Sequence, residues 1–325
     1  MSDCCTDACC CGKVIDATVV TPVIGSKRVE PGKYKGSAAK VFFSPIIDAE
    51  HLIKLYNLVN SEIYGRVAIK LHTGEKHGPN ILPRDLVKAL QETIPDSNIV
   101  ETNTLYEGDR YTTEGHRETI KVNGWTFCPV DIMDEEGSVN LPVNGGFHLK
   151  EVAMGKNILN YDSMLVLTHF KGHAMGGFGG AVKNISIGIA SSHGKERIHS
   201  GQDEALPNAF EGDHDSFLEA MAEAATGVFN ALHGNMLFIN VMNNLSVDCD
   251  CDAHPEDPKM GDIGILASTD PVALDKACVD LVYASTDPGK VHLIERMESR
   301  HGIHTLEHGE AIGLGSQQYE LVELE

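Results

Sequence analysis

Polar and apolar residues alternate along this chain in blocks of two kinds. Short apolar runs are typical of buried strands, and stretches with an apolar residue every three or four positions are typical of helices. The strand-like runs are residues 41–44, 67–71, 98–103, 164–167, 237–241 and 263–267. The helix-like stretches are residues 48–62, 83–94, 113–124, 217–233, 271–282, 292–299 and 305–312. This alternation predicts an α/β fold: a mainly parallel sheet with helices on both faces.

Local signals refine this outline. Asp48 suits the capping position of its helix, and Pro83 suits the first helical position of the next one. Residues 144–146, Asn-Gly-Gly, favour a hairpin turn. Weaker strand signals lie at residues 129–134, 151–161 and 319–322, the last of which is expected to be an edge strand. The polar segment 202–215 is expected to be exposed.

The chain divides into an extension and one domain. Residues 1–37 show no clear period and contain five cysteines, at positions 4, 5, 9, 10 and 11, so we expect a mobile, cysteine-rich extension. These thiols either bind a soft metal ion such as zinc or copper(I) or are incidental to a tail. Residues 38–325 are expected to form a single α/β domain, in which residues 38–160 and 161–325 are two candidate lobes.

The composition excludes some partners. The 26 basic and 47 acidic residues give a formal charge of −21, which repels phosphate backbones and anionic lipid surfaces. We therefore expect no nucleic-acid partner and no membrane partner. The chain has no apolar run of about 18 residues and no basic-then-apolar leader, so we expect a cytoplasmic protein.

The chemistry concentrates in residues 168–199, directly after the strand-like run 164–167. In open α/β sheets, ligands bind beyond the carboxyl ends of the strands, so this stretch is expected to build the site. His169 and His173 are predicted metal ligands that a loop brings together. Lys171 and Lys183 are predicted to hold an anionic substrate or to carry protons. The alternative is one packed and one exposed histidine.

A glycine-rich segment lies inside this stretch and contains Gly176, Gly177, Gly179 and Gly180. These glycines allow a tight turn whose backbone amides face one point, and a helix that opens near Ala181 would strengthen an anion site. Asn184 would then lie in the first helical turn, among the cofactor contacts. The pattern is neither a Walker loop nor G-x-G-x-x-G, so it supports nucleotide binding only weakly. The alternative is that the glycines merely let a helix approach a strand.

A second group of candidate ligands follows the strand-like run 237–241. Cys249 and Cys251 flank Asp250, and in extended backbone such a pair places both sulfurs on one side. Two thiolates do not fill a tetrahedral site, so histidines from residues 168–199 would complete it. The alternative is a pair of buried thiols.

Two further strand-like runs end in polar residues. His72 and Glu75 follow residues 67–71 and are predicted catalytic groups, whereas Asn103 and Arg110 lie at and after the end of residues 98–103 and are predicted cofactor contacts. All of them would lie at the carboxyl edge of a parallel sheet and would form one polar pocket. Three late histidines have a spacing that suits a metal but are predicted to form a solvated helix face: His301, His304 and His308.

Five ordered motifs carry a resemblance to a known family. They are I-K-L-H-T-G-E (69–75), E-T-N-T-L-Y-E-G-D-R (101–110), T-H-F-K-G-H-A-M-G-G-F-G-G-A-V-K-N (168–184), D-C-D-C-D (248–252) and D-I-G-I-L-A-S-T-D-P-V-A-L-D (262–275). Together they resemble domain-of-unknown-function family 362, a group of uncharacterised iron–sulfur-centre proteins, over residues 38–325. Many proteins of that family look as if they carry a ferredoxin-like insert, which would lie before the helix that starts at residue 217 in this chain. This chain has only residues 201–215 there, without a cysteine, so the resemblance does not imply two ferredoxin clusters.

The histidine and lysine loops also resemble, more distantly and by analogy only, the lactate-racemase group of nickel enzymes. We therefore predict a metal- or iron–sulfur-associated protein, an enzyme or a redox component, whose His-, Lys- and Gly-rich pocket takes a small anionic ligand. A redox partner protein would fit this role. The first alternative is a metal-independent protein that binds a small anion or a nucleotide and has structural cysteines. The second is a scaffold whose N-terminal thiols receive a metal and pass it on.

Overall fold

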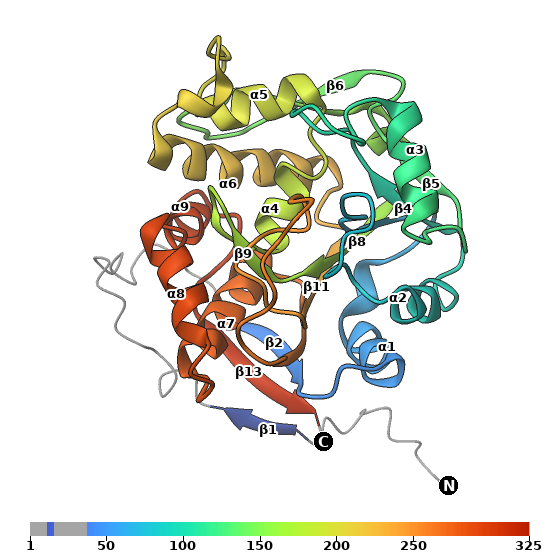
Figure 1. The fold of residues 1–325 in the computed structure, drawn as a ribbon, viewed down its shortest axis with the longest axis vertical. Coiled ribbons are helices and arrows are strands. Elements are labelled where there is room, and N and C mark those ends of the chain that lie inside the picture. Colours follow the sequence, from blue (N-terminus) through green and yellow to red (C-terminus); the bar gives the residue numbers. More distant parts are fainter. Residues whose placement is uncertain (1–11, 16–37, 325) are drawn as a thin grey trace, which may run out of the picture.

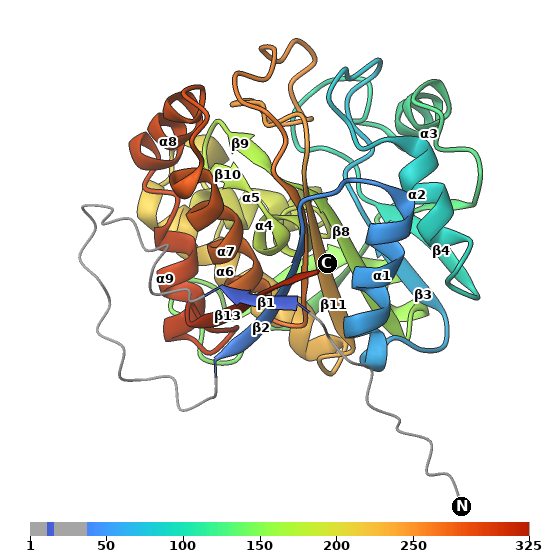
Figure 2. The same cartoon turned by 90° about the horizontal axis from the view of Figure 1, so that it is seen from below.

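The computed structural model describes residues 12–15 and 38–324. Within these residues the chain builds one nine-stranded sheet with helices on both faces (Figures 1 and 2). The strand order is β1-β13-β2-β12-β11-β8-β3-β4-β5, and five of the eight neighbouring pairs are parallel. The predicted α/β fold with a mainly parallel sheet is confirmed. The cysteine-rich segment at positions 4–11 lies outside the described residues.

The strands match the apolar runs closely. Those of the large sheet are β1 (Gly12–Ile15), β2 (Ala39–Ser44), β3 (Val67–Lys70), β4 (Ser97–Glu101), β5 (Val130–Ile132), β8 (Ser163–His169), β11 (Met236–Met242), β12 (Gly264–Ser268) and β13 (Tyr319–Leu324). Two small hairpins complete the set: β6 (Ser138–Pro142) with β7 (Glu151–Gly155), and β9 (Lys171–His173) with β10 (Gly177–Gly179). β13 pairs with β2 on one side and β1 on the other, so the expectation that it forms an edge is wrong for the described residues.

Seven of the helices in the described residues lie where the period predicts them. The helices are α1 (Ala49–Val59), α2 (Arg84–Gln91), α3 (Thr113–Val122), α4 (Ala181–Ser186), α5 (Ser192–Ser200), α6 (His214–Ala231), α7 (Pro271–Ala284), α8 (Lys290–Ser299) and α9 (His304–Ala311), with short 3₁₀ turns at Asn60–Glu62, Lys156–Asn160 and Ala209–Glu211. Of these, α5 was not predicted, and α4 was considered only as a helix opening near Ala181. Asp48 caps α1 by accepting the N–H of His51, as predicted. Pro83 lies one position earlier than predicted, as the residue before α2. No helix in the described ranges is long and apolar enough to cross a membrane.

Side-chain alternation along β8 divides the core into two layers. Met164 and Val166 face the layer that contains α4, α6 and α7, whereas Leu165 and Leu167 face the layer that contains α1 and α2. All four side chains are fully buried, and each contributes roughly 1.5–3 kcal/mol through the area that it removes from water. A strand buried on both faces reads as a continuous apolar run, which explains why the run was visible in the sequence.

The two candidate lobes share this one sheet. β2, from the first half of the domain, lies between β13 and β12, which both come from the second half. The two halves are therefore interleaved within one sheet. The polar segment 202–215 is not wholly exposed, because Ala209 is buried.

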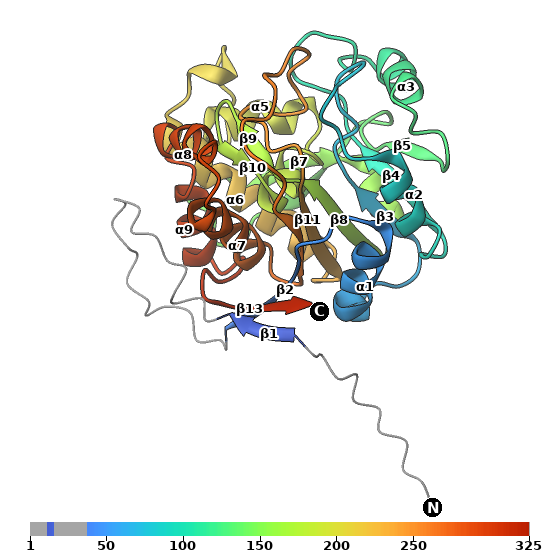
Figure 3. The same cartoon turned by 60° about the horizontal axis from the view of Figure 1, so that its bottom comes forward.

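Four adjacent parallel strands, β4, β3, β8 and β11, end at the same edge of the sheet. Figure 3 shows the loops that follow β4 and β11 on this side. They touch, because the hydroxyl of Tyr106 lies 3.3 Å from the carbonyl oxygen of Cys251. This edge is where the sequence places its candidate chemistry.

Candidate functional site

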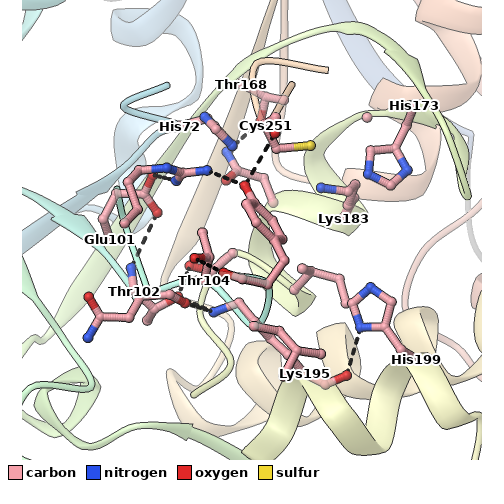
Figure 4. A pocket seen from close by; sticks show the side chains of 18 of the residues that line it. His72, Glu101, Thr102, Thr104, Thr168, His173, Lys183, Lys195, His199 and Cys251 are labelled. Atoms are coloured by element: carbon pink, nitrogen blue, oxygen red, sulfur yellow. Dashed lines mark hydrogen bonds and ion pairs between the residues drawn. The ribbon is translucent and has the colours of Figure 1, made fainter. Parts of the chain in front are cut away.

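A cavity of about 100 Å³ lies at this edge of the sheet. It is lined by the ends of β4 and β8, by the loops that follow β3, β4 and β11, by the β9–β10 hairpin and by α4 and α5. Its polar lining includes His72, Glu101, Arg110, Thr168, His169, Lys171, His173, Lys183, Asn184, Lys195, His199 and Cys251. Figure 4 shows the Cys251 sulfur, His173 and Lys183 around one space.

The thiol pair and one histidine converge beside this cavity, and two of the three, Cys251 and His173, line it. The sulfurs of Cys249 and Cys251 and a ring nitrogen of His173 all lie within 4.8 Å of one another. A thiol–thiolate hydrogen bond from Cys251 holds the pKa of Cys249 well below its usual range, and the ammonium groups of Lys171 and Lys183 act in the same direction. The sequence placed these three donors together, and the structure brings them together.

His173 is oriented by the hairpin that carries it. Its Nδ1 accepts the backbone N–H groups of Gly176 (2.8 Å) and Met175 (3.2 Å), so Nε2 is the nitrogen that remains for a ligand. Burial, with help from Lys183, holds the pKa of His173 well below its usual range. The ring is therefore neutral at pH 7, and Nε2 carries the proton that a bound metal would displace.

His169 does not join this group, so its prediction as a metal ligand is wrong for this structure. Its Nδ1 lies 2.9 Å from a carboxylate oxygen of Asp250, and its Nε2 lies 2.7 Å from the carbonyl oxygen of Asn243. Internal partners therefore engage both ring nitrogens, and His169 is not among the donor atoms that lie together with the two sulfurs. Lys171 lies 3.1 Å from the same carboxylate. Burial would lower the pKa of Lys171, but Asp250 outweighs this effect and raises it.

Lys183 is the cation that the protein leaves available. Among the described residues it makes no hydrogen bond or ion pair, and its side chain lines the cavity (Figure 4). His72 adds a neutral donor: its Nδ1 accepts the N–H of Gly74 at 3.0 Å, so Nε2 carries the hydrogen. Burial, with Arg110 as the next cause, holds the pKa of His72 well below its usual range. Lys183 and His72 can therefore both donate to one small anion.

Glu75, a predicted catalytic carboxylate, is not part of the cavity lining. Its Oε1 accepts from Arg110 (2.6 Å) and from the hydroxyl of Tyr106 (2.6 Å). Glu75 therefore holds the Arg110 side chain in place instead of facing the cavity. The carboxylate that does line the cavity is Glu101, which the sequence reasoning missed. Glu101 accepts from Lys70 at 3.0 Å and from the N–H of Thr73 at 2.9 Å. Burial acts to raise its pKa, but Lys70 and the other cations outweigh burial, so the pKa lies below the usual range.

The glycine-rich segment does not form the expected anion cradle. The N–H groups of Ala181 and Val182, at the start of α4, are taken by the carboxylate of Asp275 at 2.7 and 3.0 Å. Burial raises the pKa of Asp275 to about 6. An internal side chain thus occupies the place predicted for a ligand. Gly180 is required there, because a Cβ at this position would lie 2.4 Å from Oδ1 of Asp275.

The other predicted cofactor contacts divide into two groups. Gly176 and Gly177 are not in the cavity lining: Gly177 has φ +77° and lies against Gly302, so a Cβ there would come within 2.9 Å of that Cα. Gly179 and Asn184 do line the cavity, although Asn184 is already bonded to Lys70 (3.0 Å). Asn103 also lines it, but its side chain bonds to His116 and Thr113 on the far side.

Two further residues of the lining come from α5 and were not singled out in the sequence. Lys195 donates to Thr102, to the carbonyl oxygen of Asn103 and to that of Ala190, all within 2.7 Å, and burial lowers its pKa to about 7. His199 donates from Nδ1 to the carbonyl oxygen of Lys195 (2.7 Å), so its Nε2 is a free acceptor. Burial lowers the pKa of His199 to about 4. Both residues lie in the histidine- and lysine-rich stretch. Their separation of four positions, which places them on one face of a helix, was the signal that could have identified them.

A protein-family model described as "Domain of unknown function (DUF362)" matches residues 67–280. The chain belongs to the DUF362 family. The matched range contains every cavity residue from His72 to Cys251, so the whole site lies within the DUF362 region.

Among solved structures, the chain is similar to the lactate racemase apoprotein from Thermoanaerobacterium thermosaccharolyticum, with 16% identity, a TM-score of 0.38, and coverage of 62% of this chain and 50% of that one. It is also similar to a protein from Thermotoga maritima, with 13% identity, a TM-score of 0.37, and coverage of 72% and 59%. This DUF362 chain thus spans half the length of the first neighbour and 59% of the second. No curated protein sequence matches it.

Proposed function

We propose that this protein binds one metal ion through Cys249, Cys251 and His173 and holds a small carboxylate or similar anion beside it. The observation that carries the proposal is the convergence of two sulfurs and one imidazole nitrogen within 4.8 Å of one another, beside a cavity that Cys251 and His173 line. Two thiolates and an imidazole are donors that suit zinc, copper(I) or nickel. Three protein ligands leave a coordination position open, as in catalytic rather than structural metal sites.

The donor set fits a single ion better than an iron–sulfur cluster. A cubane or rhombic cluster takes four protein ligands, usually four cysteines. The described residues bring only two cysteines and one histidine to this point. A bound ion would supply Lewis-acid or electron-transfer chemistry, and a redox partner protein remains a prediction that depends on which of the two applies.

The chain's own residues would bind and orient the anion. Lys183 supplies an ammonium group that has no partner among residues 12–15 and 38–324, and His72 supplies a neutral Nε2–H. His199 presents an unprotonated Nε2 that can accept a proton or a hydrogen bond from the ligand. The cavity volume of about 100 Å³ restricts the ligand to a small molecule.

The metal half of the proposal is tested by metal analysis of protein purified without oxygen. In every sample the cysteines at positions 4, 5, 9, 10 and 11 are changed to serine, so that these five thiols do not contribute to the measured metal content. This background and a Cys128→Ser control, whose thiol lies elsewhere, are expected to contain equal amounts of metal, of which one equivalent belongs to the cavity site. The Cys249→Ser, Cys251→Ser double variant is expected to lose that equivalent. Equal metal in the double variant would overturn the proposal.

The anion half is tested by thermal unfolding with small carboxylates. They are expected to raise the Tm of the wild type and of a Lys150→Met control, whose side chain is 93% exposed, but not of Lys183→Met. If the same stabilisation persists in the double cysteine variant and in the presence of chelators, the metal-independent anion-binding alternative is the correct one.

A further inference from the structure

A second cluster of titratable side chains lies outside the cavity, where α6, α9 and the β6–β7 hairpin meet. Its members are His148, His301, His304, His308, Asp215, Glu219, Glu223 and Glu307. None of them lines the cavity. Figure 1 shows α9 packed beside α6 on this side of the molecule. The expectation of a simple solvated helix face is therefore wrong, because His308 is buried and each of the three late histidines pairs with a carboxylate.

The charges of this cluster are not balanced by lysine or arginine. Among the described residues, Asp215, Glu219 and Glu307 make ion pairs with histidines only. Glu219 alone faces three of them, since its oxygens approach His148, His304 and His308. The shared carboxylates concentrate negative charge around the rings, which favours a cation over an anion at this place.

Three donors of the cluster are already assembled. One nitrogen of His301, one nitrogen of His304 and one carboxylate oxygen of Glu307 lie within 4.8 Å of one another. The two rings stack with centroids 4.7 Å apart and planes 12° apart. His301 has φ +49°, an uncommon conformation for a residue with a side chain, at the turn between α8 and α9. The turn thus holds the His301 ring against the first residue of α9.

Neighbouring carboxylates hold both rings. Asp215 lies 2.8 Å from Nδ1 of His301, and Glu219 lies 2.8 Å from Nε2 of His304. Carboxylates that orient imidazole ligands in this way accompany most histidine metal sites. The side chain of His301 is 44% exposed, so an ion can enter from solvent.

We propose that His301, His304 and Glu307 form a second metal site, for a divalent ion of the zinc class. Imidazole and carboxylate donors without sulfur suit such an ion and distinguish this site from the thiolate group in the cavity. Asp215 and Glu219 act as orienting partners from α6. A bound ion would tie the α8–α9 turn to α6, and through Glu219 and His148 to the β6–β7 hairpin.

Calorimetric titration of the untagged, metal-stripped full chain with Zn²⁺ tests this site. His301→Asn removes the imidazole but keeps a residue that tolerates positive φ, and Glu307→Gln removes the charge with little change in shape. Each variant is expected to lose one equivalent of zinc, or to bind it at least about tenfold more weakly, relative to wild type and to a His254→Ala control on an exposed loop.

The double cysteine variant separates this site from the one in the cavity, because it is expected to keep the zinc equivalent that His301→Asn loses. Circular dichroism without zinc establishes that each variant is folded. Zinc stoichiometry and affinity equal to wild type in both folded variants, His301→Asn and Glu307→Gln, would overturn the second site and leave the cavity proposal untouched.

Discussion

The histidines around the cavity differ in which ring nitrogen the protein engages. His72 and His173 accept backbone N–H groups at Nδ1, whereas His199 donates from Nδ1 to a carbonyl oxygen. His169 is bonded at both nitrogens. The first two rings present a donor to the cavity, the third presents an acceptor, and the fourth presents neither. One residue type therefore supplies three chemical roles within a single pocket.

The buried ring of His199 should make folding sensitive to acid. Its pKa is lowered from 6.5 to about 4, so between these values the unfolded chain binds a proton that the folded chain does not. Stability is full above about pH 6.5 and should fall by about 3 kcal/mol as the pH drops to about 4. Urea unfolding across this range should show a shallower pH dependence for His199→Phe than for wild type. An equal pH dependence of the free energy of unfolding in both proteins would contradict a lowered pKa for His199.

Asp250 should matter more for stability than either cysteine beside it. Its carboxylate is buried between His169 (2.9 Å) and Lys171 (3.1 Å). Asp250→Asn leaves a buried ammonium group without its counter-charge, which typically costs about 3–5 kcal/mol. The free energy of unfolding from urea titration measures this loss, with the exposed Asp252→Asn as the control. A loss no larger than that of the control would show that the pair is not needed.

At the scale of single residues, the sequence indicated the right segments but not the right partners. The C-x-C spacing correctly put two sulfurs on one side, because side-chain direction follows from local backbone. Nothing in the sequence indicated that Asp250 would form a hydrogen bond with His169, because that contact joins residues 81 positions apart. Glu75 and Glu101 likewise look equivalent in sequence, and only the positions of Lys70 and Arg110 decide which of them faces the cavity.

The elements were predictable because their signals are local. The caps and the apolar period define α1 and α7, and the doubly buried β8 reads as a continuous apolar run. The antiparallel direction of β12 was not predicted, because the loop between β11 and β12 has a length that no periodicity constrains. The predicted anion site at the glycine-rich segment was wrong for a related reason. The carboxylate that accepts the N–H groups at the start of α4 belongs to Asp275 of α7, which is distant in the sequence.

The junction between that segment and α4 gives a prediction at the scale of the element. Gly180→Ala would place a Cβ 2.4 Å from Oδ1 of Asp275, which forces α4 away from α7. We expect a loss of about 1–3 kcal/mol in the free energy of unfolding. Gly108→Ala is the matched control, since its new Cβ would meet nothing closer than 3.9 Å. Similar losses in both variants would show that the close approach of Gly180 to Asp275 does not matter for stability.

At the scale of the whole molecule, the charge of −21 should destabilise the compact state through self-repulsion. Raising NaCl from about 10 mM to about 150 mM shortens the screening length from about 30 Å to about 8 Å. We therefore expect the Tm from calorimetry to rise over this range. Lys183→Met should respond in the same way, which separates screening from anion binding in the cavity. A falling Tm would show that favourable ion pairs dominate instead.

The ammonium group of Lys183 has no partner in the described part of the chain and lines a cavity of about 100 Å³, which has a practical consequence for binding experiments. Acetate, formate and phosphate are small enough and abundant enough in ordinary buffers to compete for it. Ligand screens carried out in such solutions would return false negatives. Protein equilibrated in a bulky zwitterionic buffer, with chloride as the sole small anion, is the appropriate starting material for finding the natural occupant.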